Sequence, residues 1–224
     1  MRIVFGLLSL YFLLAAPVQA AGQAILRTEQ NGRVEQTPLV WLNDRALRMD
    51  LTHPPAEILL HQGSLYVISQ IGGLSVVATV ASADQLAQAL GQGAGALDQI
   101  NHEMASSVSQ FEAMGHQETI AGIRGEQYRV VWVDQQGKSH TDVVVLSHAP
   151  VVVELTRALQ NMAVAANKGR DARMIEFVRK GWGVLRYGQA YRLESISEKS
   201  PESGLLALPT QSIDVQGILQ GLSR

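Results

Sequence analysis

The sequence predicts a single α+β domain, and three features of the residue pattern favour this fold class. Early in the chain, apolar and polar residues alternate with the period of two that is typical of half-buried strands. The pattern then changes to the spacing of amphipathic helices, and alternation returns in later hairpins. No internal repeat or low-complexity linker divides the chain. Strands that precede and follow helices in this way indicate one α+β domain.

Composition limits the classes of protein to which the chain can belong. Its 224 residues are 46% hydrophobic, 17% charged and 5% aromatic, which excludes collagen-like, coiled-coil and disordered chains. There are 18 Lys and Arg residues and 20 Asp and Glu residues, so the chain lacks the basic field that nucleic-acid binding needs. The absence of cysteine excludes disulfides, thiol nucleophiles and thiolate metal sites.

The first 20 residues have the layout of a cleaved secretory signal peptide. A basic start precedes an apolar run over residues 3–16, and residues 17–20 supply a helix breaker and small residues at the cut. This run of about 14 residues is shorter than the roughly 20 that cross a bilayer. We therefore expect cleavage before Ala21 and a periplasmic mature chain, residues 21–224, that does not span the membrane. An uncleaved anchor and full secretion are the alternatives.

Strands are expected first. Residues 23–69 follow a period of two, which places one face of each strand in the core and the other in water. Residues 74–80 form a β-branched run that predicts a strand buried on both faces. The clearest alternation has its apolar members at Leu47, Met49 and Leu51.

Helices are expected at four places. A capping box precedes residues 82–90, and an apolar stripe with helical spacing predicts a second helix over residues 97–111. A proline at the first helical position favours a third helix over residues 150–166, and a shorter one follows at residues 171–180. The stripe of the second helix consists of Leu97, Ile100, Met104, Val108 and Phe111.

Two further hairpins complete the predicted fold. One spans residues 127–147, with Tyr128 and Trp132 on the same face of its first strand. The other spans residues 183–197. The C-terminal tail, residues 210–224, contains a weak helix from residue 212 onward.

Motifs that carry catalysis or bind metal are not found in the sequence. The pair His102 and Glu103 resembles the start of a zinc-binding helix, but Ser106 stands where the second histidine is required. Glycines at 91, 93 and 95 follow a predicted helix rather than a strand, so they do not indicate a phosphate loop. We expect no catalytic residue, metal or cofactor. Histidines gathered by folding into an enzyme site remain an alternative; the others are His53, His61, His116, His140 and His148.

Apolar side chains on the predicted strands are the candidate binding residues. Such side chains can line a cleft under the helices and hold an acyl chain or a partner's apolar segment. Packing in the core is the alternative for each of them. The candidates are Trp41, Leu47, Met49, Tyr66, Tyr128, Trp132, Tyr187 and Tyr191.

Two stretches resemble a family of bacterial exported domains of unknown function. The first runs from residues 119–122 to the strand at 128–132, and the second joins residues 183–196 to residues 205–209. In outline, residues 24–209 are similar to the periplasmic lipoprotein carriers and their outer-membrane receptor, the LolA/LolB-like group. The resemblance implies a strongly curved antiparallel sheet, an unclosed half-barrel, covered by helices.

Together, the export signal, this resemblance and the missing catalytic motifs predict a non-enzymatic periplasmic protein. Its expected ligand is a lipid, an acyl chain or an acylated protein, bound in the half-barrel. The alternative is an envelope interaction module that meets a protein partner through a sheet edge or through residues 212–224.

Overall fold

The structure, a computed structural model, describes residues 21–30, 33–52, 55–79, 104–166, 170–189 and 191–214. The predicted signal peptide lies outside these residues, as do the predicted helix at residues 82–90 and most of the tail. Within the described ranges, no helix is long and apolar enough to cross a membrane.

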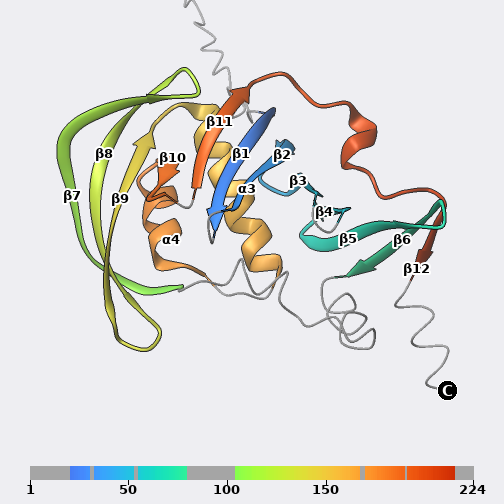
Figure 1. The fold of residues 1–224 in the computed structure, drawn as a ribbon, viewed down its shortest axis with the longest axis horizontal. Coiled ribbons are helices and arrows are strands. Elements are labelled where there is room, and N and C mark those ends of the chain that lie inside the picture. The colour runs from blue at the N-terminus through green and yellow to red at the C-terminus, as the bar shows by residue number, and fades with distance from the viewer. Residues whose placement is uncertain are drawn as a thin grey trace, which may run out of the picture.

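Among the residues that the structure describes, twelve strands form one large, unclosed sheet (Figure 1). Their order is β12-β6-β5-β4-β3-β2-β1-β11-β10-β9-β8-β7. All neighbours are antiparallel except β12 and β6, which are parallel. The strands are β1 (Gly22–Gln30), β2 (Arg33–Asn43), β3 (Ala46–Thr52), β4 (Pro55–His61), β5 (Ser64–Ile71), β6 (Leu74–Thr79), β7 (Ala105–Ile120), β8 (Ile123–Asp134), β9 (Ser139–Ser147), β10 (Gly183–Tyr187), β11 (Tyr191–Ser197) and β12 (Ser212–Asp214).

Helices α3 (Pro150–Ala165) and α4 (Ala172–Arg179) pack on the same face of the sheet (Figure 1). Pro150 begins α3, as predicted from its fixed φ and missing N–H. Asp171 caps α4 by accepting a hydrogen bond from the backbone N–H of Arg173, and Gly181 follows the helix with a φ of 70°. The ring of Tyr191 packs against two clusters of buried hydrophobic residues, one under α3 and one under α4. The predicted α+β class, with an antiparallel sheet and helices across it, is confirmed.

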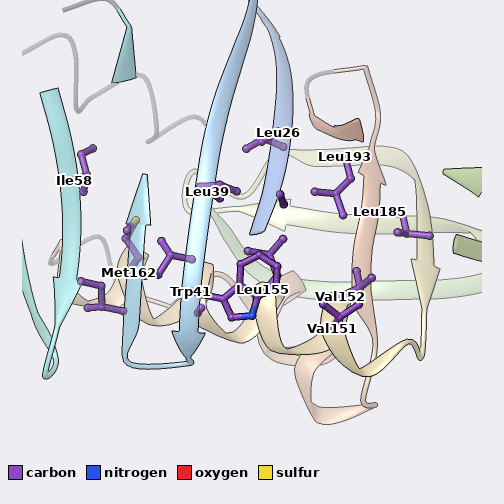
Figure 2. Close-up of a cluster of buried hydrophobic side chains, with 14 of the residues drawn as sticks. Leu26, Leu39, Trp41, Ile58, Val151, Val152, Leu155, Met162, Leu185 and Leu193 are labelled. Atoms are coloured by element: carbon purple, nitrogen blue, oxygen red, sulfur yellow. The ribbon is translucent and has the colours of Figure 1, made fainter. Parts of the chain in front are cut away.

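The larger core lies between α3 and strands β1 to β5, and Figure 2 shows the strand side chains directed toward those of the helix. Every second residue of these strands faces α3, so the predicted alternation is confirmed. The labelled members in Figure 2 are Leu26, Leu39, Trp41, Ile58, Val151, Val152, Leu155, Met162, Leu185 and Leu193.

The opposite face of the same strands is also covered. Leu59 and Ile68 point away from α3 and pack against Leu206 of the 3-10 helix η2 (Ser203–Leu206). A nitrogen of the His61 ring, Nδ1, lies 3.1 Å from the carbonyl oxygen of Leu206. The segment after β11 therefore runs across the back of the sheet before its last strand, β12, pairs with β6.

The sheet curves strongly at its β7 end. A Cβ on Gly125 of β8 would lie 2.6 Å from Cγ1 of Val145 and 2.7 Å from Cδ1 of Leu185, so only glycine allows this close approach. The end of β7 then reaches strands that are not its sheet neighbours. Its Glu118 pairs with Arg186 of β10 at 2.9 Å and with Arg192 of β11 at 2.8 Å.

The helix predicted over residues 97–111 is wrong for residues 105–111, which belong to β7. The register of β7 against β8 shifts between residues 105 and 107 and again between 108 and 110. Each extra residue in such a bulge turns a spacing of two into a spacing of three. Ala105, Val108 and Phe111 thus share one face of a strand at intervals that match a helix.

Two expectations about the other end of the sheet are also wrong. Strand β6 is not buried on both faces, because Leu74 is 59% exposed and Ala78 is its one described buried residue. Residues 212–214 form strand β12 rather than a helix. Pairing with the β6 edge decides the conformation there, since strand formation depends more on neighbours than on local preference.

Candidate apolar binding site

The eight predicted site residues fall into three places. Trp41 and Leu47 have no exposed surface and pack under α3, with Met49 beside them. These three residues belong to the tightly packed larger core. Tyr66 does not lie with them, because it packs on the opposite face near Leu206.

The other four predicted residues lie together under α4, in a second cluster of the core. Trp132 is buried there, and Tyr128, Tyr187 and Tyr191 are partly buried. Burial raises the pKa of both Tyr187 and Tyr191 above the ordinary value for tyrosine. Burial also acts on Tyr128, and with the hydrogen bond from its hydroxyl to Glu126 it raises the pKa of Tyr128 to about 12.

Phe111 is the centre of an aromatic group in this second cluster. Its ring stacks on Tyr128 and on Trp182, each with a centroid separation of 4.7 Å. Phe177 of α4, fully buried, lies 6.0 Å from the ring of Phe111. Sequence reasoning did not include Phe111, Phe177 or Trp182 among the site residues. For Phe111 the sequence signal is the stripe of Leu97, Ile100, Met104, Val108 and Phe111, whose spacing predicts a helix and not a strand.

A histidine holds the indole of Trp182 in place. Trp182 Nε1 donates a hydrogen bond to His148 Nε2 at 2.7 Å, and His148 Nδ1 lies 2.9 Å from the carbonyl oxygen of Gly181. In this pattern Nε2 of His148 accepts from the indole and Nδ1 faces the carbonyl oxygen as a donor. The indole is thereby fixed against the ring of Phe111.

An open groove of about 390 Å³ lies between β7 and α4. Phe111 lines it, so the aromatic group continues to the surface. Ile175, 39% exposed, forms part of the helical wall. The volume lies in the range of small-molecule pockets, which are mostly apolar with a few polar groups. The groove is lined by Val108, Ser109, Gln110, Phe111, Ala172, Ile175 and Glu176.

Charged side chains surround the end of the groove nearest the C-terminus of α4. Glu176 Oε1 lies 2.8 Å from Arg179 Nη2 and 3.6 Å from Lys180 Nζ. The hydrogen bond from Arg179, with the charges of Arg179 and Lys180, holds the pKa of Glu176 below its usual value. Glu176 is therefore a carboxylate whose charge is already matched by neighbouring cations.

A polar network fixes the other end of α4 to the sheet. The guanidinium of Arg173 lies 3.9 Å from the ring centroid of Trp132 and donates hydrogen bonds to Asp171 and to the Tyr187 hydroxyl. Asp142 accepts hydrogen bonds from Trp132 Nε1 and the Tyr187 hydroxyl. Burial acts to lower the pKa of Arg173, but the Asp171 and Tyr187 contacts outweigh it and raise that pKa. Arg173 stays a cation in this site.

Three of the described histidines, His61, His140 and His148, have separate partners. His61 contacts Leu206 and His148 contacts Trp182, whereas His140 Nε2 lies 2.8 Å from Asp134 Oδ2. Among residues that the structure describes, no group of three or more His, Asp or Glu side chains is placed to hold a metal ion. His53 and His102 lie outside those residues.

Fold and groove together define the class of molecule: an unclosed, mainly antiparallel sheet with α3 and α4 on one face and an open groove of mixed polarity beside α4. No protein-family model matches the chain, and no curated protein matches it. Among solved structures, the crystal structure of MucB is similar, with 15% sequence identity and a TM-score of 0.32. The match covers 86% of this chain and 58% of the MucB chain. This likeness assigns no family, so the LolA/LolB-like resemblance stays a sequence-based expectation.

Proposed function

We propose that this chain is a non-enzymatic exported protein that binds a single apolar chain, such as the acyl chain of a lipid, in the groove between α4 and β7. The observation that carries the proposal is the open groove, lined by both apolar and polar side chains, in which Phe111 stacks on a partly buried group of aromatic rings. An acyl chain laid in this groove would cover the exposed side chain of Ile175. Removing that surface from water favours binding.

This proposal moves the ligand from the face under α3 to the edge of α4. Side chains of α3, among them Leu155, pack in one cluster with Trp41 and Leu47, and all three are fully buried. A ligand at that face would have to displace the helix. At the groove, a ligand needs no such rearrangement.

The test uses 1-decanol, an uncharged single-chain probe, and follows tryptophan fluorescence because Trp182 stacks on the groove residue Phe111. Ile175→Glu places a carboxylate in the groove and is expected to weaken binding about tenfold. The matched control is Val164→Glu, since Val164 is a similarly exposed β-branched residue on α3. Saturable binding that Ile175→Glu weakens and Val164→Glu leaves unchanged supports the proposal. No saturable binding by the wild type, or equal binding by both variants, refutes it.

A second candidate function is an envelope interaction module, and strand β12 favours it. Three residues, Ser212–Asp214, add in parallel to the edge of β6, although the rest of the sheet is antiparallel. Ile213 stays 38% exposed in this position. A short, exposed strand is easily exchanged for a strand of another protein.

Crosslinking in the source cell separates the two candidates. If the chain is an interaction module, it is expected to form a crosslink to a specific partner. That crosslink should persist in the Ile175→Glu variant and should be lost when residues 212–224 are removed. A crosslink that survives removal of this segment would eliminate β12 as the point of contact.

A further inference from the structure

The groove described above has a cationic end. Lys180 directly follows α4, and its Nζ lies 5.4 Å from the ring centroid of Phe111 and 5.2 Å from that of Trp182. The ammonium group therefore lies beside Phe111, the aromatic residue that lines the groove. It is partly exposed, with 37% of its side-chain surface accessible.

Charges around the groove favour an anion. Glu176 is the carboxylate among the residues that line the groove, and two cations, Arg179 and Lys180, lie within 4 Å of it. Glu176 makes its short contact with Arg179, whereas its distance to Lys180 Nζ is 3.6 Å. One positive charge is thus left over at the end of the groove where Lys180 lies.

Backbone acceptors at this helix end do not compete for Lys180. The carbonyl oxygens of Glu176, Phe177 and Val178 accept hydrogen bonds from the backbone N–H groups of residues 180, 182 and 181, respectively. The last turn of α4 is therefore closed by its own backbone. The Lys180 ammonium keeps hydrogen-bond donors for a ligand at the mouth of the groove.

On the basis of the proposed function, we propose that the ligand is a single-chain amphiphile with an anionic head, as in a fatty acid. The chain lies along Val108, Phe111 and Ile175, and the carboxylate is bound by Lys180 Nζ. A groove with apolar side chains along its length and a cation beside one end fits both parts of such a molecule. A neutral chain would leave this cation without an added partner, and a cationic head would be repelled by it.

The experiment compares decanoate with 1-decanol, which have the same chain, at pH 8 and below the micelle-forming concentration. The wild type is expected to bind decanoate about fivefold more tightly than 1-decanol. Lys180→Gln is expected to abolish this preference by weakening decanoate binding and leaving 1-decanol binding unchanged. Lys180→Arg keeps the charge and should keep the preference. Lys199→Gln, in the loop after β11, is the matched control for loss of one lysine.

The outcomes separate this inference from the proposed function. Equal wild-type binding of the two probes, or a preference that survives Lys180→Gln, overturns the anionic head while the groove remains a site for apolar chains. Failure of both probes to bind overturns the inference together with the proposed function. Circular dichroism of each variant verifies that a change in affinity does not come from unfolding.

Discussion

Helices α3 and α4 cover the sheet in different ways. Helix α3 has eight buried residues and packs on strands whose inward side chains are mainly aliphatic. Helix α4 is half as long and has one, Phe177. Its neighbours are aromatic rings and a network of charged groups.

This difference indicates that stability and ligand binding depend on different regions of the molecule. A helix inserted by many apolar contacts cannot be shifted without large loss of buried surface. A short helix fixed at one end by polar contacts covers its strands incompletely and leaves a groove. We therefore assign most of the stability to the α3 region and the ligand surface to the α4 region.

The largest effect is expected in the α3 region. Trp41→Ala should lower the free energy of unfolding by about 3–5 kcal/mol, because the side chain is fully buried and leaves a cavity. Urea denaturation followed by circular dichroism measures this change. The control, Leu42→Ala, removes the next side chain on the same strand, which is 49% exposed, and should change little. Comparable losses in the two variants would contradict the assignment of stability to this core.

A smaller effect is expected at the polar end of α4. Arg173→Leu should cost about 2–3 kcal/mol, because Asp171 and Asp142 lose their cation in a partly buried site. The control, Arg179→Leu, removes an arginine of the same helix whose side chain is 68% exposed, and should leave the unfolding temperature nearly unchanged. Thermal unfolding of the three proteins checks the order. If Arg173→Leu lowered the free energy of unfolding more than Trp41→Ala does, α4 rather than α3 would be the main stabilising helix.

The ion pairs of Glu118 give a pH-dependent prediction. Burial opposes ionisation of Glu118, but hydrogen bonds and charges of Arg192 and Arg186 outweigh it and hold the pKa of Glu118 below its usual value. A lowered pKa stabilises the fold above the unfolded value, and this contribution is lost as pH falls through the folded value. Glu118→Gln should cost about 1 kcal/mol at pH 7.

Urea denaturation at a series of pH values tests that linkage. Below pH 4.5, the ordinary value for Glu, the wild type should lose stability more steeply than Glu118→Gln. Parallel curves for the two proteins would show that Glu118 does not fasten the end of β7 to β10 and β11.

The smallest effect is expected for a single hydroxyl in the aromatic group. Tyr128→Phe removes the 2.8 Å hydrogen bond to Glu126 and should cost about 0.5–1 kcal/mol. Because the pKa of Tyr128 is raised to about 12, its contribution to stability is complete below pH 10 and declines between pH 10 and 12. The difference in tyrosinate absorbance between wild type and variant reports the titration of Tyr128, and its midpoint should lie near pH 12. A midpoint near 10 would mean that water reaches this hydroxyl.

Local sequence patterns are sufficient to predict the helices and strands in which apolar residues recur at a regular spacing. The helix that begins at Pro150, the helix capped by Asp171 and the hairpins on either side of them follow directly from spacing and caps. Strand β7 could not be recognised in the same way, since its bulges imitate the spacing of a helix. The hydroxyls of Ser106 and Ser109 bond carbonyl oxygens of β8 at these bulges.

The candidate site was less predictable than the fold. Alternation shows that Tyr128 and Trp132 share a face, but it does not show which helix covers that face. Phe111 and Trp182 come together only because β7 and the end of α4 meet in space. The groove depends on this tertiary contact, for which a single sequence carries no signal.

The pairing of β12 with β6 has a consequence for how the chain is made. Residues Leu74–Thr79 of β6 are synthesised long before Ser212–Asp214 of β12. The edge of β6 that pairs with β12 therefore lacks this strand until nearly all the described residues have been synthesised. An uncapped apolar strand attracts other nascent chains. Because β12 is the last described strand to cover this edge, its deletion is expected to lower the yield of soluble protein.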